Sequence, residues 1–323
     1  MTEQIETQTD DFLYGLAALR LAVPKDADLL FGARASGLYH SSDGLSWTPA
    51  MELPESQAYS ATVVTVAPGR SADESIFVGL SGGIVYSRNA GETWFSSKLP
   101  SPPPVIACIA VSPNYASDGI VLAGSMEDGV LRSADRGQTW SAWNFGLLDL
   151  GVMCLSLSPD FAEDETVFAG TESSLFRSTN GGRAWREVEL PSGYDPVMSL
   201  ACSPDFSQQP GGGGVLFAGT ESQGLFRSLD RAKTWHSVGA GMLEGIIQNL
   251  YLDGSAAENL DCLAVADGKV FLSRNQGDTW CPLWEEHTLL QPTVAVLAKD
   301  GLRPGASAWL GFSSGGVARV SLP

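Results

Sequence analysis

Six acid or amide side chains recur at one position of a repeated hairpin. Side chains of this kind can bind a cation, act in catalysis, or organise a turn. They are Asp43, Asn89, Asp135, Asn180, Asp230 and Asn275. An Asp or Asn oxygen can accept hydrogen bonds from backbone N–H groups of its own turn, and Asn does this as well as Asp. Because three of the six are Asn, the pattern favours a structural role over a metal-binding or catalytic one.

Each copy of the hairpin starts at a serine and ends at a tryptophan. The copies run Ser41–Trp47, Ser87–Trp94, Ser133–Trp140, Ser178–Trp185, Ser228–Trp235 and Ser273–Trp280, with tryptophans 47, 46, 45, 50 and 45 residues apart. A tryptophan supplies a large apolar body that packs between sheets, and the glycine inside the hairpin supplies a backbone with φ > 0. The six acid or amide residues and the six tryptophans are therefore the predicted structural set.

The hairpin resembles the Asp-box, or bacterial neuraminidase repeat, whose pattern is Ser-x-Asp-x-Gly-x-Thr-Trp. Residues 133–140 match it in full, and the other copies depart at one or two positions, such as Ala232 for Gly and Ala184 for Thr. The first copy is one residue short, with Ser46 for Thr. The resemblance covers nearly the whole chain and is closest in style to photosystem II assembly factors and sorting receptors. Sialidases and other glycan-active enzymes carry the repeat too, so the fold alone does not select a function.

The repeat also sets the architecture. Each unit contains four short strands with period-2 alternation and no convincing helix, which are the dimensions of a propeller blade. We expect an all-β, seven-bladed β-propeller forming a single domain over residues 1–323. The predicted blades are 13–56, 57–103, 104–150, 151–196, 197–244, 245–290, and 291–323 with 1–12. The last unit lacks a fourth strand, so we expect residues 1–12 to lie beside Gly316–Val320 and close the ring without an open sheet edge.

No catalytic constellation stands out. By the resemblance, a sialidase would carry an arginine trio, a tyrosine–glutamate pair, an acid–base aspartate and an Arg-Ile-Pro motif in the first blade, where residues 18–24 read ALRLAVP instead. The histidines His40, His236 and His287 lack metal-ligand spacing. No phosphate loop or nucleophile motif is present. We therefore expect no catalytic residues, metal or cofactor, and keep a glycan-binding or glycan-cleaving propeller as the alternative.

Four arginines fall at one equivalent position of the repeat. They are Arg132, Arg177, Arg227 and Arg319. Glu172 and Glu221 in the preceding turns are candidate cross-strand partners for Arg177 and Arg227. The other interpretation is an arginine-rich patch like that of photosystem assembly factors. Arginines converging on the central mouth would favour a glycan ligand, and arginines buried between blades would favour a scaffold.

Composition and charge limit the classes of partner that we expect. Lys and Arg total 19 against 37 Asp and Glu, giving a net charge of −18. Such a surface repels nucleic acid and anionic lipid, and no apolar run is long enough to span a membrane. Cys108 and Cys154 occupy equivalent positions in two apolar strands, as expected of core residues in a reducing compartment. With no visible signal peptide, we expect a cytoplasmic protein, although an exported form that has lost its leader stays open.

Topology predicts where a partner docks. The turns between second and third strands share one face with the connections between blades. The candidate partner face comprises Glu127, Asp128, Glu172, Glu221, Leu147, Tyr194 and Trp284. Apolar groups ringed by acids are typical of a protein-binding surface, and ordinary loop variation produces them as well. The sequence therefore predicts a non-enzymatic protein-interaction or assembly scaffold whose partner is a protein or a larger assembly.

Overall fold

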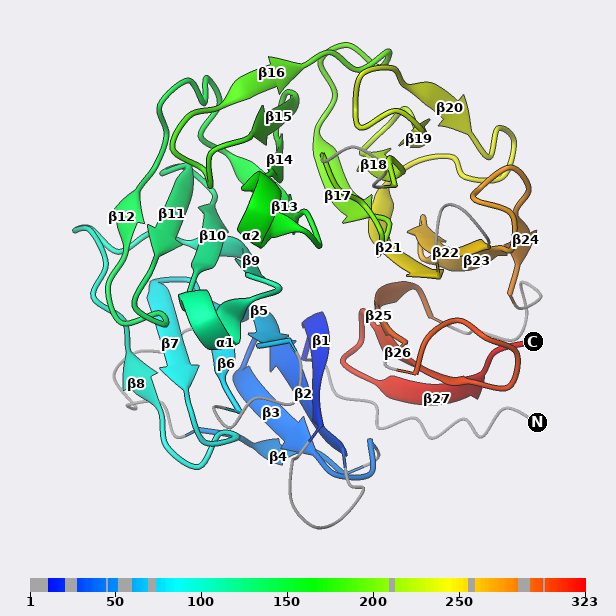
Figure 1. Cartoon of the computed structure of the whole chain (residues 1–323). Helices are drawn as coiled ribbons and strands as arrows, with labels where there is room; N and C mark the ends of the chain where they lie inside the picture. The colour runs from blue at the N-terminus through cyan, green and yellow to red at the C-terminus, as the bar shows by residue number, and fades with distance from the viewer. Residues whose placement is uncertain are drawn as a thin grey trace.

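The computed structural model is a seven-bladed, all-β propeller, as predicted (Figure 1). It describes residues 11–20, 28–44, 46–51, 60–68, 74–208, 213–254, 259–283, 291–298 and 300–323. Each blade is one antiparallel sheet whose strands follow chain order from the central axis outward. Six blades have four strands, and blade 7 has three within these residues.

The strands of blades 1–4 are β1 (Leu13–Arg20), β2 (Asp28–Arg34), β3 (Gly37–Ser41), β4 (Thr48–Pro49); β5 (Ala61–Val66), β6 (Ile76–Leu80), β7 (Gly83–Ser87), β8 (Phe95–Ser96); β9 (Ile106–Val111), β10 (Val121–Ser125), β11 (Val130–Ser133), β12 (Ser141–Ala142); β13 (Val152–Leu157), β14 (Val167–Thr171), β15 (Leu175–Ser178), β16 (Arg186–Val188). Those of blades 5–7 are β17 (Val197–Cys202), β18 (Leu216–Thr220), β19 (Leu225–Ser228), β20 (His236–Val238); β21 (Ile247–Gly254), β22 (Leu260–Ala266), β23 (Lys269–Ser273), β24 (Cys281–Pro282); β25 (Thr293–Leu297), β26 (Ser307–Phe312), β27 (Val317–Ser321).

The second strand of each blade lies deepest in the core. Every residue of β6, β10, β14 and β18 is buried, because both faces of these strands pack against neighbouring blades. Close packing needs a small residue here. A β-carbon on Gly124 of β10 would lie 2.5 Å from Cγ1 of Val152 in the next blade. The short β8 and β12, by contrast, are exposed at the rim.

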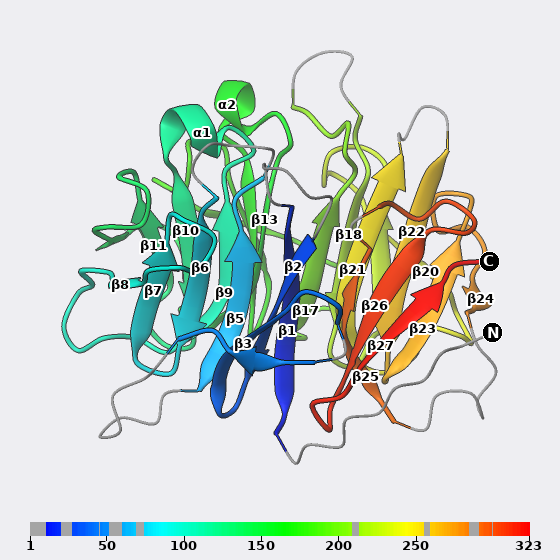
Figure 2. The ribbon, with the colours of Figure 1, turned by 90° about the horizontal axis from the view of Figure 1, so that it is seen from below.

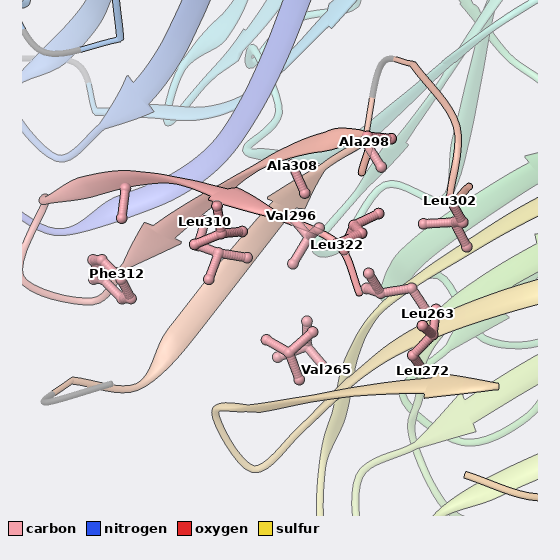
Figure 3. Packing of buried hydrophobic residues seen from close by; sticks show 14 residues of the cluster. Leu263, Val265, Leu272, Val296, Ala298, Leu302, Ala308, Leu310, Phe312 and Leu322 are labelled. Carbon is pink, nitrogen blue, oxygen red and sulfur yellow. The ribbon is translucent and has the colours of Figure 1, made fainter. Parts of the chain in front are cut away.

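The core consists of apolar layers between blades. Figure 3 shows the layer between blades 6 and 7, where Leu263 and Val265 of β22 and Leu272 of β23 face Val296 of β25 and Leu310 of β26. All five are buried. Because burial of apolar side chains is the main stabilising contribution, each blade depends on its neighbours for stability.

The two faces of the ring differ. The turns between third and fourth strands, which hold the repeated hairpins, lie on the same face as the connections between first and second strands; we call this the hairpin face. Two single-turn helices, α1 (Tyr115–Asp118) and α2 (Phe161–Asp164), lie in those connections and project from this face (Figure 2). Neither helix is predicted from the sequence, because four residues are too few to show a 3.6-residue period. The opposite face, which carries the second-to-third-strand turns and the connections between blades, is called the interblade face.

Ring closure differs in part from the expectation. The expected strand over residues 1–12 falls mostly outside the described residues. Within them, Asp11 and Phe12 join blade 1: the Ala35 N–H donates to the Phe12 carbonyl (2.9 Å), and the Ser36 N–H donates to the Asp11 carboxylate (2.9 Å). Blades 7 and 1 meet through an apolar layer that includes Leu13 and Trp309. Side-chain packing at this join is of the same kind as between the other blades.

Candidate partner-binding surface

The six hairpins share one hydrogen-bond pattern. In each, Oδ1 of the Asp or Asn accepts from the motif serine hydroxyl, at 2.8–3.0 Å, and from a backbone N–H three or four residues further on, also at 2.8–3.0 Å. Asp43, Asn89, Asp135, Asn180, Asp230 and Asn275 all take this position. Because one neutral oxygen suffices for both bonds, a negative charge is not needed for the turn.

Asp and Asn differ at the second terminal atom of the side chain, which is Oδ2 in Asp and Nδ2 in Asn. Oδ2 of Asp230 accepts from the Thr234 hydroxyl at 2.6 Å, whereas Nδ2 of Asn275 donates to the Thr279 hydroxyl oxygen at 2.9 Å. The hydroxyl reverses its role, and both residues are satisfied. Desolvation raises the pKa of the Asp230 carboxyl, but hydrogen bonds from Thr234 and Ser228 outweigh it and bring the pKa to about 2.

The hairpin tryptophans pack between blades. Trp140, Trp185, Trp235 and Trp280 are buried, while Trp47 and Trp94 are half-buried. Five of the six indole N–H groups donate to backbone carbonyls, such as Trp140 to Gly137 of its own turn at 3.1 Å and Trp185 to Trp143 of the preceding blade at 2.8 Å. The buried indole nitrogen of Trp235 has no hydrogen-bond partner among the described residues. The tryptophans therefore fasten each hairpin to the ring.

Two of the aligned arginines, Arg177 and Arg227, reach across to the next blade, not back to their own turn. Nη1 of Arg227 pairs with the Asp278 carboxylate at 2.6 Å and donates to the Gln276 carbonyl at 2.6 Å. Nη1 of Arg177 donates to the Arg231 carbonyl at 3.5 Å. The expected pairing with Glu172 and Glu221 is wrong. Those glutamates lie at the interblade end of the strand and the arginines at the hairpin end, and a strand rises about 3.3 Å per residue.

The other two aligned arginines stack on tryptophans. The guanidinium of Arg132 lies 4.3 Å from the ring centroid of Trp143, and Arg183 lies 5.5 Å from the same ring. Burial, and secondarily the nearby Arg183, lower the pKa of Arg132. Arg319 lies 5.6 Å from the Trp309 ring. All four aligned arginines stand on third strands, away from the innermost strands that surround the axis.

The interblade face is built on a repeated contact. In every blade, the first residue of the second-to-third-strand turn donates its N–H to a carbonyl that precedes the innermost strand, at 2.9–3.1 Å. Two buried or half-buried acids strengthen this contact. Asp149 accepts from the N–H (2.9 Å) and hydroxyl (2.6 Å) of Ser173, and Asp195 accepts from the hydroxyl of Ser222 at 2.9 Å. The connections before blades 4 and 5 are therefore fixed to the turns beside them.

Most candidate face residues lie exposed on this platform. Glu127, Asp128, Glu172 and Glu221 are exposed, and Tyr194 is 90% exposed. Trp284 lies outside the described residues.

The prediction that Leu147 lies on the exposed face is wrong, because its side chain is only 6% exposed and belongs to the core layer with Val152. Its neighbour Leu148 is 81% exposed and takes its place on the surface. In a connection without regular secondary structure, no hydrophobic periodicity indicates which of two adjacent leucines is buried.

Further exposed apolar residues lie on this face beyond the candidate set. Val105, Met126, Leu150 and Met242 are each 38–50% exposed. The sequence holds one signal for them: the blade 3 turn begins with Met126, where blades 4 and 5 begin with Glu172 and Glu221.

The described part of the chain shows neither a metal-binding cluster nor a membrane-spanning helix. It contains no group of three or more His, Cys, Asp or Glu side chains that could hold a metal ion. No helix within it is long and apolar enough to cross a membrane. The five thiols are free, and burial raises the pKa of Cys108 to about 12.

Comparison with known proteins gives the fold. No family model matches the chain, and no curated protein matches it in sequence. YCF48 bound to a D1 peptide superposes with a TM-score of 0.70 at 13% identity, over 98% of this chain and 94% of that one. YCF48 from Cyanidioschyzon merolae superposes with 0.66 at 12%, over 99% and 98%. The GH74 xyloglucanase from Xanthomonas campestris gives 0.73 at 16%, over 99% of this chain and 53% of the enzyme. All are similar in fold. At these identities the similarity extends no further than the propeller.

Proposed function

We propose that this protein is a non-enzymatic scaffold that binds a protein partner through its interblade face, in the manner of an assembly factor. The observation that carries the proposal is the set of exposed apolar side chains on that face, led by Leu148 (81% exposed) and Tyr194 (90% exposed). Solitary exposed apolar residues are ordinary, but several on one face are typical of interaction sites.

The exposed residues stand on rigid supports. Leu148 lies between buried Leu147 and hydrogen-bonded Asp149, and Tyr194 precedes buried Asp195. A surface already held in place loses little conformational entropy on binding, which favours recognition over a passive loop.

The comparisons and the arginines support the same function. YCF48, which this chain matches in fold over nearly its full length, has been solved with a bound peptide. The fold likeness to a GH74 enzyme keeps a glycan ligand as the alternative. Against that alternative, Arg177 and Arg227 bond to the neighbouring blade instead of converging on the central mouth.

Affinity capture from the native host tests the proposal. The wild-type chain should retain a protein that the double variant Leu148→Ser, Tyr194→Ser loses. Phe95→Ser, which changes a residue that is 49% exposed on the rim strand β8, should still retain it. Equal capture by all three proteins, or retention of a glycan in place of a protein, would overturn the proposal.

A further inference from the structure

The interblade face of blades 3–5 is predominantly acidic. The interblade face of these blades comprises residues 97–105, 126–129, 143–151, 172–174, 189–196, 221–224 and 239–246. These segments hold eight Asp or Glu residues and one basic residue, Lys98. Lys98 is the second residue of its segment and lies at the rim, where its backbone N–H donates to the Gln138 carbonyl of a hairpin at 2.8 Å. The hairpins of the same blades, residues 134–140, 179–185 and 229–235, carry four basic residues and two acids, Asp135 and Asp230.

Within the acidic face, four exposed apolar residues form what we call the apolar patch: Val105, Met126, Leu148 and Leu150. Two backbone hydrogen bonds bring three of them together, and Leu148 lies two residues before Leu150. The Met126 N–H donates to the Val105 carbonyl at 3.0 Å, and at the other end of the same turn the Gly129 N–H donates to the Leu150 carbonyl at 2.9 Å. The 126–129 turn of blade 3 therefore lies between the segments that lead into the first strands of blades 3 and 4.

Exposed acids border the apolar patch closely. Glu127 and Asp128 occupy the middle of the turn between Met126 and Gly129. On the far side, the Glu172 N–H donates to the Gly151 carbonyl at 3.0 Å, next to Leu150. A ligand seated on the apolar patch would thus have carboxylates on both sides.

The turn is held in shape by a side-chain amide. Oδ1 of Asn144 accepts from the Val130 N–H at 2.8 Å, and its Nδ2 donates to the Asp128 carbonyl at 2.8 Å. The acids and the apolar groups therefore keep a fixed relation to one another, as a specific surface requires.

Building on the proposed function, we infer that the apolar patch binds a partner segment in which apolar side chains stand next to lysine or arginine. The apolar side chains cover Met126 and Leu150, and the cations face Glu127, Asp128 and Glu172. Complementary charge of this kind steers encounter and fixes register. The same acids repel anionic lipid and nucleic acid, which disfavours either as the occupant.

Two matched peptides test the inference on the full chain. One combines leucine with lysine, and the other has the same leucines with glutamate. We expect the Leu/Lys peptide to bind and the Leu/Glu peptide not to bind by isothermal titration. Affinity should fall as salt rises from about 0.05 to about 0.5 M, because the Debye length shortens.

Matched variants locate the binding. Met126→Ser with Leu148→Ser, or Glu127→Gln with Glu172→Gln, should weaken binding roughly tenfold or more, the scale expected of interface hot spots. Leu229→Ser removes an apolar residue that is 51% exposed on a hairpin, and Glu92→Gln with Glu163→Gln removes the same charge from the hairpin face. These controls should bind like the wild type. Melting curves of all variants confirm that they are folded.

The outcomes separate this inference from the proposed function. Equal losses with the hairpin-face controls, tight binding of the Leu/Glu peptide, or no binding of the Leu/Lys peptide would overturn the inference. A host protein captured through Leu148 and Tyr194 would still support the proposed function in that case.

Discussion

Gly44 in the first hairpin lies directly against the indole ring of Trp309 from blade 7. A β-carbon on Gly44 would be 2.1 Å from Cζ3 of that ring. Gly277 has the same relation to Phe217 of the preceding blade, at 2.8 Å. The join between the last and first blades therefore uses the contact that joins blades elsewhere.

Gly44→Ala should destabilise the contact between blades 7 and 1. The glycine has φ +75°, and the added methyl must displace a rigid indole. Left-handed strain and overpacking together should cost roughly 2–4 kcal/mol of unfolding free energy. Chemical denaturation measures the loss, and hydrogen exchange should rise first in β1 and β25–β27.

Gly181→Ala is the matched control, with φ +68° and no atom closer than 3.7 Å to the added carbon. This substitution should lower the unfolding free energy only by the cost of the left-handed backbone conformation, about 1 kcal/mol. Equal effects of the two substitutions would mean that the Trp309 contact contributes nothing to closure.

Trp140→Ala should be severely destabilising. The side chain is 7% exposed and is packed in the layer between blades 2 and 3. Truncation of a buried aromatic costs roughly 3–5 kcal/mol. Thermal melting should show a large loss for this variant and little change for Phe95→Ala, whose ring is 49% exposed. A Trp140 variant that melts like the parent would refute the role of the hairpin tryptophans.

Asp230→Asn should cost little, and the cost should depend on pH. Near neutral pH we expect a loss of no more than about 1 kcal/mol, the scale of one hydrogen bond, because Asn275 makes the equivalent contacts. The folded pKa of Asp230 is about 2, below its ordinary value of 3.8. The contribution of the carboxylate is therefore present in full above that ordinary value and is lost as pH falls toward 2.

Urea denaturation of both proteins across that range is the measurement. The difference in unfolding free energy should shrink as the pH falls. A difference several times larger at neutral pH would show that the charge itself stabilises the hairpin, and a difference that grows on acidification would contradict the lowered pKa of Asp230.

The sequence predicted what is encoded locally. All contacts of Asp135 in its turn are made with residues at most four positions away, from Ser133 to Thr139. Seven residues of spacing are therefore enough to recognise the hairpin, and six copies in register define the ring.

Long-range partners could not be predicted in the same way. Asp278, which pairs with Arg227, is 51 residues away in the next blade, whereas Glu221 is nearer in sequence but at the wrong end of the strand. The apolar patch depends on the bond between Gly129 and Leu150, which join a turn to a separate connection. Such pairs become visible only when the blades are placed side by side.

The most direct test of the proposed partner face is site-specific photo-crosslinking in the native host. A photoreactive phenylalanine analogue is placed at position 148 or 194 on the interblade face, or at control position 229 on a hairpin or 95 on the rim, all of them exposed. We predict that positions 148 and 194 cross-link to one and the same protein and that positions 229 and 95 do not. Cross-linking of a protein only from positions 229 or 95, or from all four alike, would contradict a partner site on the interblade face.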